Sequence, residues 1–110
     1  MKEFTVQNKQ DTRSGFGAGL VELGRKNPNV IGLCADLTGS LKMGDFQKEF
    51  PDRFIQCGVA EANMMGDAVG LTIGGKILFT GTFAKFSTGR VHDQIRQSIA
   101  YFDKHVKIST

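Results

Sequence analysis

Apolar and polar stretches alternate along the chain, and the apolar ones are of two kinds. Some are short, compact runs with the length and composition of buried strands: residues 30–36, 53–58, 76–82 and 105–110. Longer stretches between them repeat apolar residues at helical spacing: residues 11–28, 43–50, 60–75 and 83–102. The pattern predicts alternating helices and strands after a polar lead-in over residues 1–10.

Local signals mark the ends of these helices. Asp11 and Thr12 are typical N-cap residues, Pro28 ends the first helix, and Pro51 ends the second. The last helical segment carries apolar residues in steps of four, which is typical of an amphipathic helix: Val91, Ile95 and Ile99.

The segment 60–75 is apolar on nearly every side. A helix of this kind is expected to be buried all round. Gly66 and Gly70 are spaced to let another element approach it closely.

Alternating strands and helices predict an α/β fold, a parallel sheet with helices on both faces, in one domain over residues 11–110. Such sheets bind ligands in crevices at the carboxyl ends of their strands. The candidate ligand segments at those ends are residues 36–40, 58–61 and 82–86.

Charge and composition limit the kinds of partner that the chain is expected to bind. The net charge is +3 and the basic residues are scattered, so no nucleic-acid-binding stripe is expected. A mild basic excess still suits a phosphorylated substrate or cofactor. The chain has no signal-like apolar start and no apolar window of membrane-spanning length, which favours a cytoplasmic protein without a membrane partner.

Several common chemical motifs are missing or weak. Cys34 and Cys57 lie in apolar runs, which is typical of buried, reduced thiols. His92 and His105 form no cluster with cysteines or carboxylates, so no metal site is predicted. The GFGAG stretch at 15–19 follows no strand and lacks the third spaced glycine of a dinucleotide fingerprint, so packing glycines are the better interpretation.

Three features remain open on local grounds. Residues 36–40 could be a polar turn or a ligand loop. Phe83 and Phe86 could be core residues or an aromatic wall for a flat ring. Glu61 begins a helix, where the dipole favours a carboxylate, but an unpaired charge ahead of a buried segment is costly. A ligand that offers a nitrogen to Glu61 would remove that cost.

Four stretches in this order carry a family resemblance: DTRSGFGAGLVELG, VIGLCADLTGS, FPDRFIQCGVAEANMMGDAVGL and FTGTFAKFSTGRVHDQIRQSIAY. Together they resemble the pyrimidine-binding domain of thiamine diphosphate enzymes, and most closely the C-terminal half of transketolases, which some organisms encode as a separate subunit. The resemblance implies the thiamine diphosphate-binding fold.

The resemblance also implies roles at the cofactor. Glu61 matches the glutamate that hydrogen-bonds N1′ of the aminopyrimidine and thereby helps to activate thiazolium C2. Phe83 and Phe86 match aromatic residues around the ring, and Asp36 and Leu37 match residues near the cofactor at a subunit interface. The chain departs from many relatives after Phe86, where Ser87, Thr88 and Gly89 suggest a thinner aromatic wall.

The resemblance implies a substrate site and a partner as well. Arg13 and Ser40 match residues that hold the phosphate end of a sugar phosphate, although Arg13 alone would be interpreted as a surface residue. The family's diphosphate motif and its metal ligands for Mg²⁺ or Ca²⁺ are not in this sequence. They are expected on an N-terminal transketolase subunit or domain, in a homo- or hetero-oligomer. The chain also stops before the family's histidine-bearing loop, so a truncated, singly inactive domain is expected.

Three functions remain open. The first is part of a transketolase, which moves a two-carbon ketol unit between sugar phosphates in the pentose phosphate pathway. The second is part of a 1-deoxyxylulose-phosphate synthase or another thiamine enzyme; the ADLTGS turn favours transketolase over it. The third is a non-catalytic interaction module with a decayed site.

Overall fold

The computed structural model describes residues 11–109, so the predicted polar lead-in over residues 1–10 lies outside the described residues. The elements alternate as the pattern predicts: α1 (Thr12–Lys26), β1 (Val30–Cys34), α2 (Gly44–Glu49), η1 (Pro51–Arg53), β2 (Phe54–Gln56), α3 (Glu61–Ile73), β3 (Ile77–Gly81), α4 (Ala84–Thr88), α5 (His92–Gln94), η2 (Ile95–Ala100) and β4 (Val106–Ser109). Here η1 is a 3₁₀ turn and η2 is a π-helical segment.

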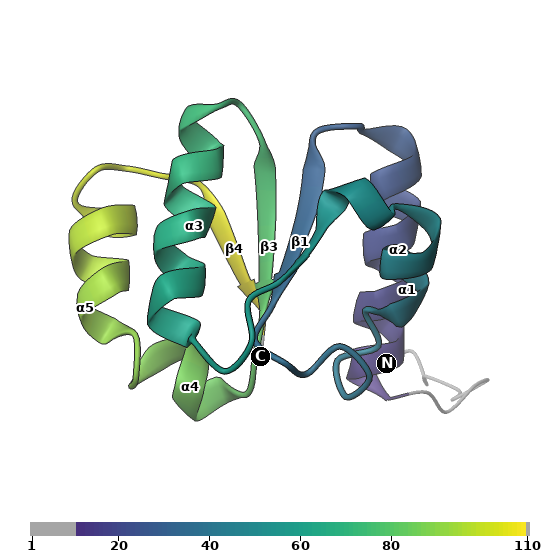
Figure 1. The fold of residues 1–110 in the computed structure, drawn as a ribbon, viewed down its shortest axis with the longest axis horizontal. Helices are drawn as coiled ribbons and strands as arrows, with labels where there is room; N and C mark the ends of the chain where they lie inside the picture. The colour runs from purple at the N-terminus through teal and green to yellow at the C-terminus, as the bar shows by residue number, and fades with distance from the viewer. Residues whose placement is uncertain (1–10, 110) are drawn as a thin grey trace, which may run out of the picture.

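The strands form one parallel sheet in the order β2-β1-β3-β4 (Figure 1). β1 pairs with β3 from Val30 opposite Ile77 to Cys34 opposite Gly81. Helices α1 and α2 lie on one side of this sheet, and α3 and α5 lie on the other. The predicted α/β class, with helices on both faces, is confirmed.

Alternation along β1 separates two cores. Ile31 and Leu33 pack with Met64 and Met65 of α3, whereas Val30 and Cys34 pack on the α1–α2 side. Every residue of β1 is buried, as expected for a central strand covered on both faces. The sheet therefore holds the carboxyl ends of its strands rigidly between two packed layers.

The first helix begins and ends where the sequence predicts. The Asp11 side chain caps it by accepting a 2.6 Å hydrogen bond from the Ser14 amide, and the helix ends at Lys26, before Pro28. A Cβ added to Gly17 would lie 2.3 Å from the Lys42 carbonyl oxygen, so this glycine allows a close approach. At Gly17, the packing interpretation of the GFGAG stretch is confirmed.

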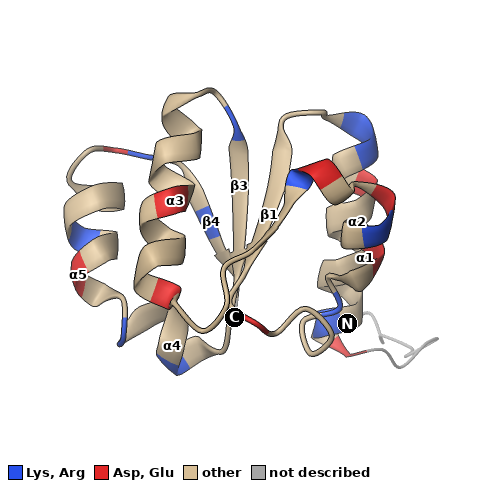
Figure 2. Ribbon diagram, in the orientation of Figure 1, with Lys and Arg blue, Asp and Glu red and all other residues tan. Residues whose placement is uncertain are grey.

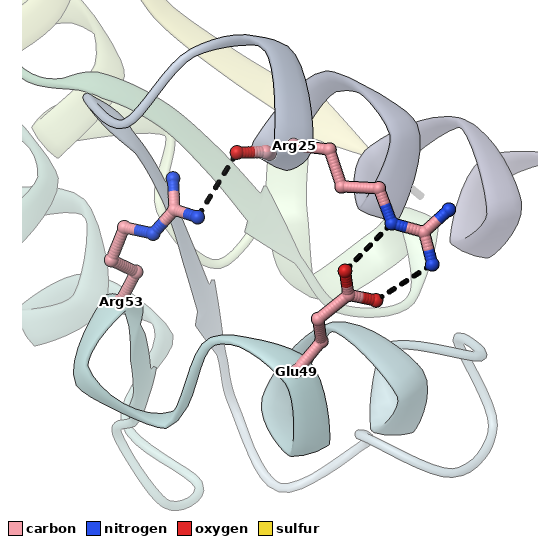
Figure 3. A network of polar contacts seen from close by, with 4 residues as sticks. Arg25, Glu49 and Arg53 are labelled. Atoms are coloured by element: carbon pink, nitrogen blue, oxygen red, sulfur yellow. Dashed lines mark hydrogen bonds and ion pairs between the residues drawn. The ribbon is translucent and has the colours of Figure 1, made fainter.

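Charged residues tie the end of α1 to α2 and η1 (Figure 3). Arg25 donates two hydrogen bonds to the Glu49 carboxylate, at 2.6 and 2.9 Å. Arg53 donates to the backbone carbonyls of Gly24 and Asn27, and its guanidinium stacks on the Phe50 ring at 3.9 Å. These contacts fix the α1–α2 layer on the face opposite α3.

One prediction about α3 is wrong. The helix buries a single face, made by Glu61, Met64, Met65 and Ala68, while its other face is open. A Cβ added to Gly66 or Gly70 meets no atom within 4 Å, and both glycines are exposed. Small residues make the segment look uniformly apolar, but one sheet can cover only one side of a helix.

The segment 83–102 is not the single amphipathic helix that its apolar spacing predicts. It is broken into α4, α5 and η2, although Val91 and Ile99 are buried as expected. The hydroxyls of Ser87 and Thr88 donate to the Ala84 carbonyl at 3.1 and 2.7 Å, which competes with the helical backbone pattern.

Acidic and basic residues are mixed over residues 11–109. Figure 2 shows acidic and basic positions interspersed along the helices and loops. Within residues 11–109, no helix has both the length and the hydropathy needed to span a membrane.

Candidate functional site

The carboxyl ends of the strands bring the predicted ligand segments to one edge of the sheet (Figure 1). The loop after β1 holds residues 35–40, the loop after β2 leads into Glu61, and the loop after β3 leads into Phe83. Backbone hydrogen bonds join neighbouring loops: Ala35 donates to Gly81 at 3.3 Å, and Cys57 donates to Cys34 at 2.8 Å. The predicted site therefore lies at a single edge, as parallel sheets favour.

Glu61 is the first residue of α3 and is almost completely buried, with 3% of its side chain exposed. The N-cap residue Ala60 provides no side-chain hydrogen bond, so the carboxylate lies at a helix N-terminus that has no side-chain cap. Its charge is matched by Arg90, whose Nη1 lies 3.3 Å from Glu61 Oε2. This contact satisfies the buried charge that the sequence left unexplained.

An aromatic surface lies beside this ion pair. The Arg90 guanidinium stacks over the Phe86 ring, with Cζ 4.0 Å from the ring centroid. Phe86 is half-buried, and Phe83 is 44% exposed where β3 leads into α4. The core interpretation is therefore wrong for Phe83, and the open interpretation as an aromatic wall is the one compatible with its exposure.

Gln56, at the end of β2, links two of the loops. Its Oε1 accepts hydrogen bonds from the amides of Asp36 at 2.6 Å and Gly58 at 3.1 Å, and its Nε2 donates to Thr38 Oγ1 at 3.0 Å. Asp36 and Gly58 both have left-handed backbones, with φ of 60° and 67°. Asp and Gly are the residue types that tolerate this conformation best, so one side chain anchors two special turns.

Arg13 and Ser40 are brought together across the start of α1. Arg13 Nη1 donates to the Ser40 carbonyl at 3.4 Å, and Arg13 also lies 3.8 Å from Asp11. Arg13 lines a pocket of about 180 Å³ with Thr12, Phe16, Leu41 and Ser109. Leu37 packs at the rim of the α1–α2 core. Besides the Asp11 carboxylate, this corner contains the Arg13 cation, the hydroxyls of Thr12 and Ser109, and the apolar side chains of Phe16 and Leu41.

The larger pockets do not mark this site. In the part of the chain that the structure describes, a pocket of about 520 Å³ lies between α1 and α2, lined by Ala18, Val21, Arg25, Asp45, Lys48 and Glu49. It contains none of the residues predicted to hold a ligand. Volume alone is therefore a poor guide here, and the chemistry at the carboxyl edge is the better one.

Neither cysteine of this region forms a disulfide. Both cysteines are free, and burial raises the pKa of the Cys34 thiol and of the Cys57 thiol, the latter further through Asp67. Neither thiol is therefore poised as a nucleophile. Within residues 11–109, no group of three or more His, Cys, Asp or Glu side chains could hold a metal ion.

Two residues of this edge were missed by the sequence reasoning. The pairing of Arg90 with Glu61 spans 29 positions, and Gln56 reaches Asp36 across 20. The cost of burying Glu61 was a signal that a cation should lie nearby. It did not say which of the chain's arginines and lysines supplies it, because that depends on where the break between α4 and α5 turns the backbone.

A protein-family model described as "Transketolase, pyrimidine binding domain" matches residues 8–110. A protein of Methanocaldococcus jannaschii, provisionally named as a transketolase C-terminal section, is 49% identical over 96 residues, which are 87% of this chain and 30% of the relative. One of the subunits of an apulose-4-phosphate transketolase from Phocaeicola vulgatus is 36% identical over 87% of this chain and 31% of the relative.

A solved structure gives the same result in three dimensions. The chain matches a structure titled "Split gene transketolase, inactive beta4 tetramer" with a TM-score of 0.80 and 52% sequence identity, over 88% of this chain and 32% of the other. The chain thus spans about a third of the length of these relatives.

Proposed function

Because the chain belongs to the transketolase pyrimidine-binding-domain family, we propose that it forms the pyrimidine side of a thiamine diphosphate site in a transketolase. The reaction is the transfer of a two-carbon ketol unit between sugar phosphates. One observation carries this proposal. The Glu61 carboxylate is 3% exposed at the N-terminus of α3, and the flat Arg90 guanidinium contacts both this carboxylate and the Phe86 ring.

The residues present fit the aminopyrimidine half of this cofactor. Glu61 is a buried acceptor, suited to a ring nitrogen that carries a proton. Phe86 offers a ring face that holds a planar, delocalised cation, and the exposed Phe83 lies on the same short segment. The Arg90 guanidinium, which is flat and rich in N–H donors, contacts both Glu61 and Phe86, and this supports the proposal that the corner suits a group of that chemistry.

The residues present do not supply the other half of the site. Residues 11–109 contain no cluster able to hold Mg²⁺ or Ca²⁺. We assign the diphosphate and the metal to an N-terminal transketolase subunit or domain, and the chain to an oligomer in which Asp36 and Leu37 lie near that partner. The relative of Phocaeicola vulgatus is named as one of the subunits of a transketolase, which supports a split arrangement.

When bound, thiamine diphosphate supplies a carbon acid and an electron sink for ketol transfer. The role of this chain is to hold and orient. Glu61 would hold a proton at the N1′ position of the aminopyrimidine, and its burial would keep that hydrogen bond away from water. Phe83 and Phe86 would offer aromatic contacts to the ring, while Gln56 holds the turns at Asp36 and Gly58 by hydrogen bonds.

Arg13 and Ser40 form the proposed phosphate end of the substrate site. The Arg13 guanidinium is half-exposed and bonded to a backbone carbonyl, so a phosphate dianion would be a stronger partner than its present ones. The ion pair between Arg13 and Asp11 is long, at 3.8 Å, so a phosphate group would displace it at little cost. Loss of Arg13 should therefore weaken binding of phosphorylated sugars more than binding of free sugars.

The test is reconstitution. The complete natural polypeptide that carries these residues is mixed with a diphosphate-binding transketolase subunit, thiamine diphosphate and Mg²⁺, and ketol transfer between sugar phosphates is measured. Activity that requires both chains and is lost in Glu61→Gln supports the proposal. Full activity in Glu61→Gln would overturn the role of Glu61.

The same experiment separates the two alternatives. Condensation of pyruvate with a sugar aldehyde, without ketol transfer, would indicate a deoxyxylulose-phosphate synthase instead. Stable assembly without cofactor binding would indicate a non-catalytic module.

A further inference from the structure

We propose that Arg90 occupies the place of the aminopyrimidine in the cofactor-free protein and must leave Glu61 before the ring binds. This inference rests on the proposed function, because it concerns the same carboxylate and the same aromatic surface. It adds a residue that competes with the cofactor and so sets its affinity.

The two ligands of this corner are chemically alike. A guanidinium is a planar, delocalised cation with N–H donors at its edge. An aminopyrimidine protonated at its ring nitrogen N1′ is also planar and cationic, with an N–H donor at its edge. Arg90 uses both features, because its edge meets Glu61 Oε2 at 3.3 Å and its face lies 4.0 Å from the Phe86 ring centroid. Occupation by one ligand therefore excludes the other.

The position of Arg90 suits a group that moves. Its side chain is 49% exposed, whereas that of its partner Glu61 is 3% exposed, so the arginine reaches in from solvent. It lies in the turn between α4 and α5, directly after the exposed Gly89, and not within a helix. Turning outward would return the guanidinium to water without opening the core.

The exchange keeps the buried charge paired. A carboxylate at Glu61 is costly to leave without a hydrogen-bond donor, so the cofactor-free protein needs a cation there. Arg90 supplies it, and the cofactor then replaces one N–H donor by another. The apparent affinity for the cofactor equals the intrinsic affinity multiplied by the fraction of molecules in which Arg90 has left Glu61, which is the usual effect of a competing closed state.

The test measures cofactor affinity by calorimetric titration of thiamine diphosphate at saturating Mg²⁺, in the assembled two-chain protein. Arg90→Met keeps an unbranched, flexible apolar side chain but removes the donor and the charge. We expect it to bind thiamine diphosphate about threefold to tenfold more tightly, as the loss of one half-exposed ion pair and one cation–π contact predicts. The cofactor-free Arg90→Met protein should also unfold at a lower denaturant concentration than wild type.

Matched variants complete the design. Arg96→Met removes a charge of the same sign from the neighbouring segment, where Arg96 pairs with exposed Asp93 at 2.8 Å, and should leave affinity unchanged. Arg90→Lys retains the charge needed for folding but loses the planar stack, and should give about a twofold gain. In a Glu61→Gln background, Arg90→Met should give a smaller gain, because the ion pair is already broken and only the contact with the Phe86 ring is left to lose.

Each result decides between the claims. Tighter binding by both Arg90 variants, with a smaller gain for Arg90→Met in the Glu61→Gln background, supports the inference. Equal or weaker binding by Arg90→Met or Arg90→Lys shows that Arg90 stays beside the bound cofactor and overturns it. Failure of the wild-type assembly to bind thiamine diphosphate contradicts the proposed function itself.

Discussion

Glycine-to-alanine substitutions at two positions of α1 should change stability in opposite directions. Gly17 and Gly19 lie two residues apart in the same helix, so both substitutions carry the same gain in helix propensity, up to about 1 kcal/mol. They differ in what a Cβ would meet. At Gly17 it would lie 2.3 Å from the Lys42 carbonyl oxygen and 2.9 Å from the Lys42 Cβ, whereas at Gly19 nothing lies within 4 Å.

The clash at Gly17 involves backbone, which cannot turn away as a flexible side chain can. Overpacking of this kind costs about 1–3 kcal/mol, so Gly17→Ala should be destabilised by up to about 2 kcal/mol after the gain in helix propensity of about 1 kcal/mol is subtracted. Gly19→Ala should be stabilised by about 0.5–1 kcal/mol. Lys42 has a left-handed backbone, with φ of 58°, which limits how far its loop can shift to relieve the clash.

The assay is denaturant unfolding of the two variants and the wild-type protein, with free energies extrapolated to zero denaturant. The account requires Gly17→Ala to be less stable than wild type and Gly19→Ala to be more stable. If both variants were stabilised equally, the loop through Lys42 would not be seated on α1. The proposed proximity of Arg13 and Ser40, which depends on that seating, would then fail as well.

Three further outcomes are expected. Gln56→Leu removes three loop hydrogen bonds and should destabilise the protein by about 1–2 kcal/mol, measured by denaturant unfolding. It should also weaken cofactor binding in the assembled enzyme, measured by titration. Unchanged stability and affinity would mean that the loops keep their conformation without Gln56. Burial raises the pKa of the Cys34 thiol above its ordinary 9.0, so the thiol of the unfolded chain loses its proton first as pH rises. The free energy of unfolding should therefore fall as pH rises past 9. Cys34→Ala should make the free energy of unfolding less dependent on pH in this range, and an unchanged dependence would argue against a buried thiol. The Arg25 hydrogen bond lowers the pKa of the Glu49 carboxyl. The contribution of this ion pair to stability is therefore present above the ordinary pKa of 4.5 and is lost as pH falls through the lowered value. Glu49→Gln should make the free energy of unfolding less sensitive to acid over that pH range, and equal sensitivity would show that the pair does not form in solution.

The main lines of the fold were predictable because they depend on local signals. The caps and prolines mark the ends of α1 and α2, and the apolar run at β1 is long enough to identify a central strand. The open face of α3 was not predictable, because small residues give no indication of which side faces solvent. The break after α4 was missed because Ser87 and Thr88 back-bond to the Ala84 carbonyl, which apolar spacing does not reveal.

The candidate site divides in the same way. Parallel alternation alone predicts that the loops after β1, β2 and β3 share one edge, and the structure places them there. Long-range pairs such as Arg90 with Glu61 need the tertiary packing of α3 against the segment after α4. The burial cost of Glu61 showed that some partner was required, but only the structure identifies which one.

The central claim is that Glu61 prepares thiamine diphosphate for catalysis. The most direct measurement is the rate at which the thiazolium C2 hydrogen of the bound cofactor exchanges with deuterium from solvent, followed by NMR in the assembled protein. Glu61→Gln should bind the cofactor but slow this exchange by on the order of 10²-fold or more, as loss of a positioned proton-transfer partner predicts. An exchange rate equal to that of wild type, with the cofactor fully bound, would contradict the account.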